Sequence, residues 1–508
     1  MSIERAIVVL ALVSCADSSP KSDLNITSRV AFEWTDEALE LPDEDVLTDA
    51  LNEAHDIYLR ERFERVLDAH DPGELLEHAS LTQLALDRGV FDNADIFIFG
   101  DELFEYAFRP ENGWGDKIMG EGPTVFRAHR ERIGGPDSFS CADCHSKGGL
   151  DGAGSITQNA YLNGDGDSLT SAVKRNAPHL LGLGPIEALA NEMTAILQSQ
   201  KKQAIRSATT AMQMVEVELE AKGVGFGSLR VSESGEVFED AITGIDTDLV
   251  VRPFGWKGRY ANLREIVEFS FRAHLGIRSA FLQQRIKEGE LDDELFGTGP
   301  WYDIDDDGVS VEIEDGMITS VAAYLAQLAI PQLRPPTHPR LQSMYEQGRI
   351  VFSQAECDDC HKAQLLLSNS VLSLRPEHPD YSDSATLKID VAIDGESPKI
   401  HRSNLNEPYV VELYSDLKRH DMGPELASVG LDDRVEAQYF LTRPLWGLAG
   451  TGPFLHDGRA LTIDEAIRYH GGEAVSSREA YLGLNADEQA SLRIFLLSLS
   501  RQPTLEVR

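Results

Sequence analysis

Two short motifs contain the side chains of this sequence that are best suited to bind a cofactor. Each motif reads Cys-x-x-Cys-His, with the ligating residues at Cys141, Cys144 and His145 and at Cys357, Cys360 and His361. Two thiols three positions apart can add to the two vinyl groups of a haem, and the adjacent His then lies under the iron. The sequence therefore predicts two covalently attached c-type haems, with His145 and His361 as proximal ligands.

Other uses of paired cysteines fit these motifs less well. A zinc site needs its cysteine pairs to converge on one ion, and it gives no reason for the His that follows each pair. A thioredoxin-like redox pair needs a βαβ pattern around a single motif, and that pattern is absent from the sequence. Haem attachment is the interpretation that uses all of these residues.

A short helix near the C-terminus is expected to carry a further haem ligand. Thr462 followed by Glu465 is a capping box, which begins a helix that continues through Tyr469. Gly471 and Gly472 end this helix, because glycine adopts the backbone conformation that terminates helices.

His470 is the expected distal ligand of the second haem. Ile463, Ile467 and His470 share one face of the predicted helix, so the imidazole can reach a buried iron without a change in the backbone. The structural alternative is a His that only complements the helix dipole in the last turn. Met422 and His420 are rival ligands for the same iron.

Composition excludes several classes of function. The chain has 508 residues, 42% of them hydrophobic and 26% charged, and its formal net charge is −39. A chain of this length can bury a sizeable core and divide into two or three domains. The negative charge repels nucleic acid, and no internal apolar stretch reaches the roughly 20 residues that span a bilayer. We expect no nucleic-acid partner and no membrane-spanning segment.

The first residues resemble a bacterial lipoprotein signal. Arg5 precedes an apolar run from Ala6 to Val13, which leads into Ser14 and Cys15. Cys15 is therefore the expected lipidation site, and the four remaining cysteines attach haem. We expect a periplasmic or cell-surface lipoprotein, anchored to the outer membrane through its lipid alone. An ordinary buried helix is the alternative for this segment.

The expected fold is mainly α-helical, with two cytochrome c-like haem domains, long loops and an N-terminal helical extension. Four prolines between Pro331 and Pro339 predict an extended boundary, and a helix over Leu341–Phe352 leads into the second motif. The predicted divisions are a signal peptide at 1–15, a tether and acidic helical extension at 16–96, a first haem domain at 97–330, a Pro-rich linker at 331–340 and a second haem domain at 341–508.

Several sequence blocks resemble known di-haem enzymes. Residues Gly452–Glu473, which read GPFLHDGRALTIDEAIRYHGGE, are similar to the C-terminal signature of bacterial di-haem cytochrome c peroxidases. A closer resemblance is to the di-haem oxidoreductase family of peroxidase-like and thiol oxidoreductase-like proteins, and it covers about Phe97 to Leu499. The blocks that carry it are GPTVF (122–126), GLGPIEA (182–188), FGWK (254–257), YSDLKRHDMGP (414–424) and RPLWGL (443–448).

The resemblance implies different roles for the two haems. The haem on His145 is expected to face the substrate, and the haem on His361 and His470 to relay electrons. His470 occupies the position of the distal Met of the peroxidases, and this departure implies a lower reduction potential. Glu187, with Glu192 as the second choice, is the expected acid that moves a proton between the peroxide oxygens.

Three further residues have a functional and a structural interpretation. His179 is a candidate reversible distal ligand of the first haem, or a structural His. Trp256 and Trp446 lie in family blocks and are candidates for electron transfer between the haems, whereas packing in the core is the alternative for each indole.

The resemblance favours an enzyme that reduces hydrogen peroxide with electrons from a redox partner protein. Two other functions stay open. One is a non-catalytic di-haem electron-transfer lipoprotein, and the other is a di-haem oxygenase or thiol oxidase, since related folds host several chemistries.

An acidic segment has the spacing of a calcium loop. Asp303, Asp305, Asp307, Gly308 and Glu314 fit the pattern Asp-x-Asp-x-Asp-Gly-x5-Glu. A helix from about Met317 to Leu328 is expected to follow, but glycines and a proline precede the segment, which argues against a true EF-hand. The alternative to Ca2+ binding is an acidic surface turn.

Overall fold

The computed structural model describes residues 81–109, 112–115, 138–162, 173–280, 287–288, 312–336, 339–374, 386–428 and 435–500. The chain divides into one unit of residues 1–75 and another of residues 76–508, and every described residue belongs to the second unit. Cys15, the signal, the tether and most of the acidic extension lie outside the described residues, as do Asp303, Asp305 and Asp307. Within the described segments, no helix is long and apolar enough to cross a membrane.

One group of helices surrounds the buried helix α8 (Asp315–Gln327), whose residues are all buried. Its neighbours are α3 (Gln83–Asp87), α4 (Asn93–Glu105) and α6 (Leu263–Ser270). Asp92 and Asp95 form a capping box that begins α4. A Cβ at Gly100 would lie 2.3 Å from the Ser320 carbonyl oxygen, so the glycine lets α4 approach α8 closely.

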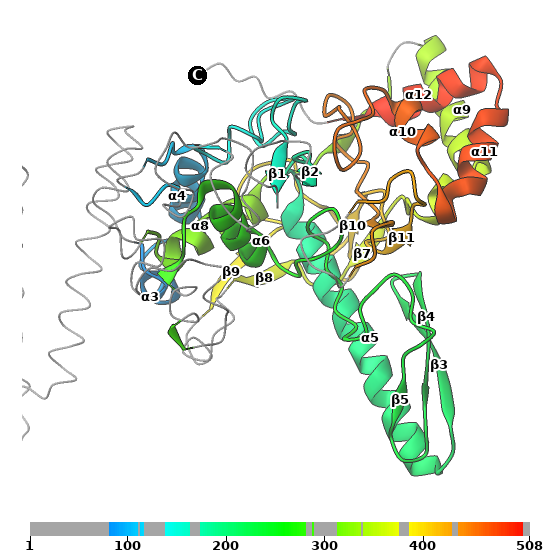
Figure 1. Ribbon diagram of the computed structural model, residues 1–508, viewed down its shortest axis with the longest axis horizontal. Coiled ribbons are helices and arrows are strands. Elements are labelled where there is room, and N and C mark those ends of the chain that lie inside the picture. Colours follow the sequence, from blue (N-terminus) through cyan, green and yellow to red (C-terminus); the bar gives the residue numbers. More distant parts are fainter. Residues whose placement is uncertain are drawn as a thin grey trace, which may run out of the picture. The chain divides into compact units, whose positions relative to one another are not determined.

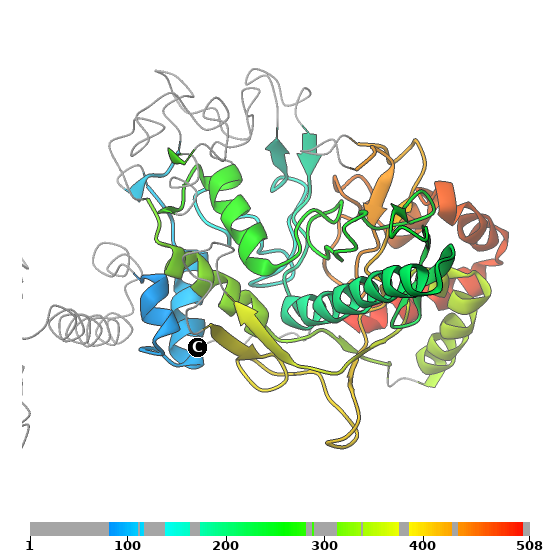
Figure 2. The same cartoon turned by 90° about the horizontal axis from the view of Figure 1, so that it is seen from below.

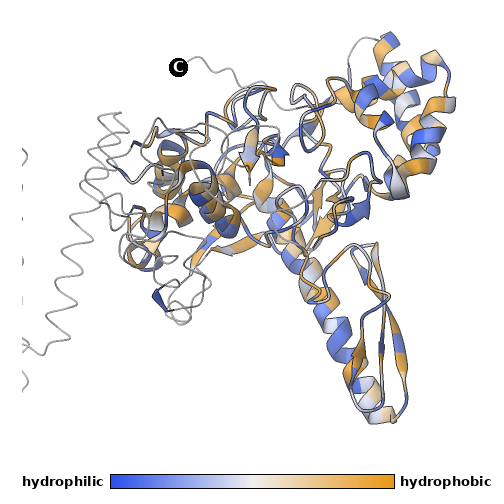
Figure 3. Ribbon diagram, viewed as in Figure 1, coloured by the Kyte–Doolittle hydropathy of each residue, from blue (hydrophilic) through white to orange (hydrophobic). Residues whose placement is uncertain are grey.

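A second group contains α9 (Pro339–Gln354), α10 (Ile463–Arg468), α11 (Val475–Gly483) and α12 (Ala486–Ser498). These helices gather in both views although α9 is far from the others in sequence (Figures 1 and 2). Hydrophilic and hydrophobic residues are interspersed along these helices, as expected of amphipathic helices (Figure 3). The Phe495 ring lies 5.9 Å from Tyr345 and 5.3 Å from Phe352, which joins α12 to α9.

The long helix α5 (Leu183–Ala211) supports a three-stranded antiparallel sheet. The strands are β3 (Val215–Ala221), β4 (Val224–Val231) and β5 (Val237–Phe238), in the order β3-β4-β5. Strand β3 alternates exposed Glu216, Glu218 and Glu220 with more buried residues, the pattern of a strand with one covered face. The sheet lies along the C-terminal part of α5 (Figure 1).

Short antiparallel pairs join distant segments of the loops. The pairs are β1 (Ala160–Leu162) with β2 (Val173–Arg175), β6 (Gln332–Leu333) with β13 (Leu499–Ser500), β7 (Leu365–Leu367) with β10 (Tyr409–Val411), β8 (Val371–Leu374) with β9 (Leu387–Asp390), and β11 (Arg419–Asp421) with β12 (Tyr439–Leu441). The β6–β13 pair attaches the proline-rich segment to the end of α12.

Local predictions from the sequence agree with these elements. The helix before the second motif is α9, the helix predicted over Met317–Leu328 is α8, and the capped C-terminal helix is α10. The fold is mainly α-helical, as expected, but the sequence analysis missed the β3-β4-β5 sheet and the short strand pairs. The division into two haem domains stays a prediction.

The contact between α9 and α12 generates a stability prediction. A Cβ at Gly348 would lie 2.1 Å from the Ser491 carbonyl oxygen, whereas a Cβ at Gly483 in α11 has no neighbour within 4 Å. We expect Gly348→Ala to lower the free energy of unfolding by about 1–3 kcal/mol, because the helices must separate. Gly483→Ala is the matched control, and its free energy of unfolding should equal that of the wild type or be slightly higher. Denaturant unfolding measures both, and equal stability of the two variants would contradict the packing described.

Candidate functional site

The first Cys-x-x-Cys-His motif lines a cavity of about 250 Å³, called the first cavity below. The amides of Cys144 and His145 both donate to the Cys141 carbonyl, at 3.2 Å each, which folds the motif into a tight turn. Asp143 accepts hydrogen bonds from the amides of Phe139 and Ser140, at 3.0 and 3.1 Å, and so fixes the entry to the turn. Both thiols and the imidazole are among the lining groups of this cavity.

Backbone carbonyls fix the orientation of His145. Its Nδ1 lies 2.9 Å from the Pro178 carbonyl oxygen and 3.3 Å from that of Gly152. A carbonyl can only accept, so Nδ1 carries the proton and Nε2 keeps its lone pair. Burial lowers the pKa of His145 to about 4. The residue is therefore a neutral imidazole at neutral pH, the form that binds a metal.

The second motif lines a cavity of about 300 Å³, called the second cavity below. A 3-10 turn at Cys357–Asp359 holds the motif, and the His361 amide donates to the Cys357 carbonyl at 3.0 Å. The Nδ1 of His361 lies 3.0 Å from the Tyr414 carbonyl oxygen. Burial, and then the charge of His470, lowers the pKa of His361 to about 4, so its Nε2 is also an available ligand.

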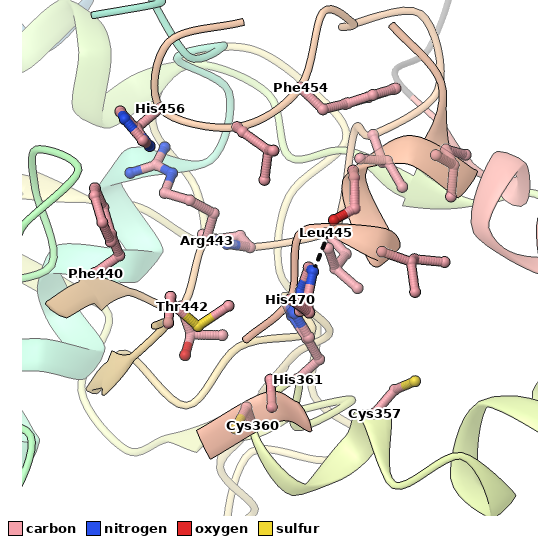
Figure 4. A pocket seen from close by; sticks show the side chains of 18 of the residues that line it. Cys357, Cys360, His361, Phe440, Thr442, Arg443, Leu445, Phe454, His456 and His470 are labelled. Atoms are coloured by element: carbon pink, nitrogen blue, oxygen red, sulfur yellow. Dashed lines mark hydrogen bonds between the residues drawn. The ribbon is translucent and has the colours of Figure 1, made fainter. Parts of the chain in front are cut away.

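His470, which follows helix α10, also lines the second cavity. Its Nδ1 lies 2.9 Å from the Ala466 carbonyl oxygen in α10, and burial lowers its pKa (Figure 4). Helix α10 begins at the predicted capping box of Thr462 and Glu465, and Ile463 and Ile467 line the cavity beside the imidazole. The structure thus brings His361 and His470 into one cavity, each with the proton on Nδ1.

His420, a rival ligand for the second haem, is already paired through both ring nitrogens. Nε2 lies 2.8 Å from an Asp416 carboxylate oxygen, and Nδ1 lies 2.7 Å from a Glu473 oxygen. Burial lowers its pKa, but the contacts with Asp416 and Cys360 outweigh burial and raise it to about 11. Both ring nitrogens of His420 thus have carboxylate partners, which favours His470 as the ligand, and His420 stays an alternative. Met422 lines the second cavity and stays an alternative to His470.

Six residues line both cavities and form the wall between them: Asn176, Ala177, Pro178, His179, Trp256 and Arg443. The Trp256 Nε1 donates to the Asn176 carbonyl at 2.8 Å, which fixes the indole in the wall. The Nε2 of His179 lies 3.0 Å from the Trp446 carbonyl oxygen, so the nitrogen that usually reaches a metal is engaged. Trp446 itself is 1% exposed, packs on Gly182 and lines neither cavity, which makes it a core residue.

The donor set of these cavities fits haem. Each cavity combines two cysteines that form no disulfide with a neutral imidazole. Because the two cysteine pairs line different cavities, they do not converge on one zinc ion. The described lining of the first cavity includes no Asp or Glu but holds the cations Arg175, Lys257, Arg259 and Arg443. A mainly apolar lining that also contains cations suits an apolar macrocycle that bears carboxylates.

The C-terminal part of the chain, which contributes to the second cavity, matches a known protein family. Residues 381–499 match the family described as "Di-haem oxidoreductase, putative peroxidase". The resemblance to that family is therefore confirmed, and the matched segment includes His470 and the α10 helix. Haem cofactors and an oxidoreductase role are what this match supports. The search of curated proteins gave no match.

Two solved structures show distant likeness to the chain. Hydrazine synthase from Kuenenia stuttgartiensis is 15% identical with a TM-score of 0.20, and the match covers 37% of this chain and 56% of that chain. A MauG-like protein associated with microbial copper homeostasis is 15% identical with a TM-score of 0.26, and the match covers 54% of this chain and 79% of that chain. This chain thus spans little more than half of the hydrazine synthase chain.

The two carboxylates expected to act as acids have structural contacts instead. Glu187 is 2% exposed and accepts a hydrogen bond from the Leu263 amide at 2.8 Å, which caps the first turn of α6. Glu192 pairs with Lys222 and accepts from the amides of Ser368 and Asn369. Neither residue is in the lining of either cavity. These contacts favour a structural role for both residues, and their assignment as acids stays a prediction, since the sequence does not show which way the helix α5 turns their side chains.

His274 is the titratable residue that the sequence analysis missed. It lies on a π-helical turn, Phe271–Leu275, which continues α6 and lines the first cavity. Its charge contributes to the lowered pKa of His145, which places the two imidazoles near each other. Single π-helical turns within helices occur often at functional sites, but the sequence carries no local signal for one.

Glu314 is the one expected calcium ligand among the described residues. It is the N-cap residue of α8, its side chain makes no capping hydrogen bond, and burial raises its pKa. Its three aspartate companions lie outside the described residues, so the calcium loop stays a prediction.

The cap made by Glu187 generates a prediction about pH. Burial raises its pKa from 4.5 to about 7 in the folded protein, so between these values the folded state holds more protons than the unfolded state. The free energy of unfolding should therefore fall by about 1–3 kcal/mol as pH rises from 4.5 to 7, and Glu187→Gln should remove this slope. Denaturant unfolding at several pH values measures it, with Glu192→Gln as control on the same helix. Parallel curves for wild type and Glu187→Gln would contradict the buried cap.

Proposed function

We propose that this chain is a c-type di-haem oxidoreductase that reduces hydrogen peroxide with electrons from a redox partner protein. One haem is attached to Cys141 and Cys144, and the other to Cys357 and Cys360. The observation that carries the proposal is common to His145, His361 and His470. Each imidazole lines a cavity and donates a hydrogen bond from Nδ1 to a backbone carbonyl, so its Nε2 is available as an iron ligand.

The second cavity would hold the relay haem, with His361 and His470 as the ligands of its iron. When bound, a haem iron with two protein ligands transfers electrons, whereas one with an open position binds a small oxidant. His361 and His470 would hold the iron from two elements whose backbones are fixed by the turn of the motif and by the capped helix α10. Two imidazoles give a lower reduction potential than an imidazole with a thioether.

The first cavity is the proposed site of peroxide reduction. His145 is the protein ligand from the motif, and the described lining contains His274 but no carboxylate. His274 is therefore the residue that we assign to proton transfer, in place of Glu187 and Glu192. Reduction of one peroxide to two waters consumes two electrons and two protons, and an imidazole within reach can transfer a proton to the leaving oxygen.

Trp256 is the proposed route for electrons between the two haems. Its indole lies in the wall shared by both cavities and is oriented by the hydrogen bond to Asn176. An electron partner is expected to be basic, because the chain has a formal net charge of −39 and attracts a positive surface at long range. Lipidation at Cys15 and an extracytoplasmic location complete the proposal, since haem is attached to thiols outside the cytoplasm.

The ligand assignment can be tested at His470. We expect His470→Ala to keep two haems per chain and to convert the second haem from low-spin to high-spin, because the iron loses one strong ligand. Electronic absorption and electron paramagnetic resonance of the oxidised protein measure the change. His401→Ala, at an exposed His, is the matched control. A second haem that stays low-spin in His470→Ala would contradict the assignment and point to Met422 or His420 instead.

The proton-transfer role can be tested at His274. We expect His274→Gln to lower the rate of peroxide reduction by roughly 10²–10⁴-fold, the usual contribution of a general acid, with haem content and the spectrum of the second haem unchanged. Stopped-flow mixing with hydrogen peroxide measures the rate. Glu187→Gln and Glu192→Gln should keep the wild-type rate. If either glutamate variant lost activity while His274→Gln kept it, the original assignment to a carboxylate would be restored.

A further inference from the structure

Arg443 is a cation without a described partner in the wall between the two cavities. It makes no hydrogen bond or ion pair with any other described residue, and its one recorded contact is with the Trp256 ring, whose centroid lies 5.5 Å from Cζ. Burial alone lowers the pKa of Arg443 to about 10. In Figure 4 its side chain extends along the cavity wall toward His456. A desolvated guanidinium of this kind requires an anion.

Neighbouring cations differ from Arg443 in being already paired. Lys257 donates to the carbonyls of Glu436, Ala437 and Tyr439, at 3.2, 2.8 and 2.9 Å. Arg175 donates to the carbonyl of Lys174 and to Ser428 Oγ.

Arg443 lies in a region rich in cations, of which Arg419 is paired with Asp246 and Arg459 with Asp457. Burial, with the nearby charges of Arg175 and Arg419, lowers the pKa of Lys257 to about 7. Burial also lowers the pKa of His456 to about 3, with Arg175, Arg459 and Lys257 acting in the same direction. Unlike Arg419 and Arg459, Arg443 has no carboxylate among the described residues, although it lines both cavities, so an anionic ligand in the cavities would supply its missing partner.

The backbone holds Arg443 rigidly where the two cavities meet. It follows strand β12, whose neighbour Thr442 donates its amide to the Lys418 carbonyl at 2.9 Å. On the other side, the Leu445 amide donates to the Leu413 carbonyl at 3.1 Å. These bonds fix the main chain on both sides of Arg443, and its guanidinium, which lies over the Trp256 ring, can offer its planar fork of donors to a carboxylate.

We propose that Arg443 binds carboxylates of both prosthetic groups and is the anchor that the two haems share. The proposal rests on the di-haem function proposed above and adds a residue that couples its two cofactors. Haem carries carboxylates on its propionate chains, and Arg443 is the one cation among the described residues that lines both cavities. Its charge stabilises the reduced, more negative state of each haem, so it raises both reduction potentials.

The test compares holoprotein variants that remove or keep this charge. Arg443→Gln removes the charge, and Arg443→Lys keeps it but loses the fork of donors. Arg230→Gln is the matched control for the change in total charge, because Arg230 is a partly exposed residue of β4 paired with Asp240. Spectroelectrochemical titration measures both reduction potentials, and resonance Raman spectroscopy of the propionate bending modes reports their hydrogen bonds.

We expect Arg443→Gln to lower both potentials and to shift the propionate modes of both haems. Arg443→Lys should keep most of each potential but still shift the modes, and Arg230→Gln should change neither. If either haem of Arg443→Gln keeps wild-type propionate modes, the shared anchor is wrong. A chain that carries no pair of covalent haems would instead overturn the proposed function.

A free anion is the other source of a carboxylate at this position. Titration of the wild-type holoprotein with acetate distinguishes the two sources. If propionates occupy Arg443, acetate up to high concentration should leave both potentials unchanged. A shift that depends on acetate concentration in the wild type, and that is lost in Arg443→Gln, would assign Arg443 to a small exogenous anion and overturn the shared anchor.

Discussion

The hydrogen bond from an imidazole Nδ1 to a backbone carbonyl is the interaction on which the candidate site depends. It occurs at His145, His361 and His470, where the accepting residues are Pro178, Tyr414 and Ala466. Each bond fixes the tautomer and the ring orientation, so that Nε2 is the atom left for iron. The carbonyls come from a loop in the cavity wall, a loop after strand β10 and the helix α10. These loops and the helix α10 hold the three carbonyls in place.

Two cavities with a common wall follow from that arrangement. The Pro178 carbonyl orients His145, and Pro178 also lines both cavities. The residue that orients the imidazole of the first cavity is therefore part of the wall of the second cavity. Trp256 and Arg443 belong to the same wall and contact each other. An aromatic ring and a cation between two cofactor sites suit electron transfer and the binding of negative groups. The wall thus connects the two halves of the chain physically.

Local features of the sequence predicted the structure best. The capping box at Thr462 and the position of His470 depend on a few adjacent residues, so both were predictable. The β3 strand, VEVELEA, has a strict alternation that the sequence analysis could have used. In contrast, the role of Glu187 depends on Leu263, which is 76 residues away, and the π-helical turn with His274 leaves no pattern in the sequence. Contacts of this kind require the tertiary structure.

Diffraction at the iron absorption edge from crystals of the purified protein tests the central claim most directly. The account predicts two anomalous peaks per chain, one bonded to His145 Nε2 and the other bonded to the Nε2 atoms of both His361 and His470. A single iron, an iron bound away from these imidazoles, or a zinc ion held by the cysteine pairs would contradict it.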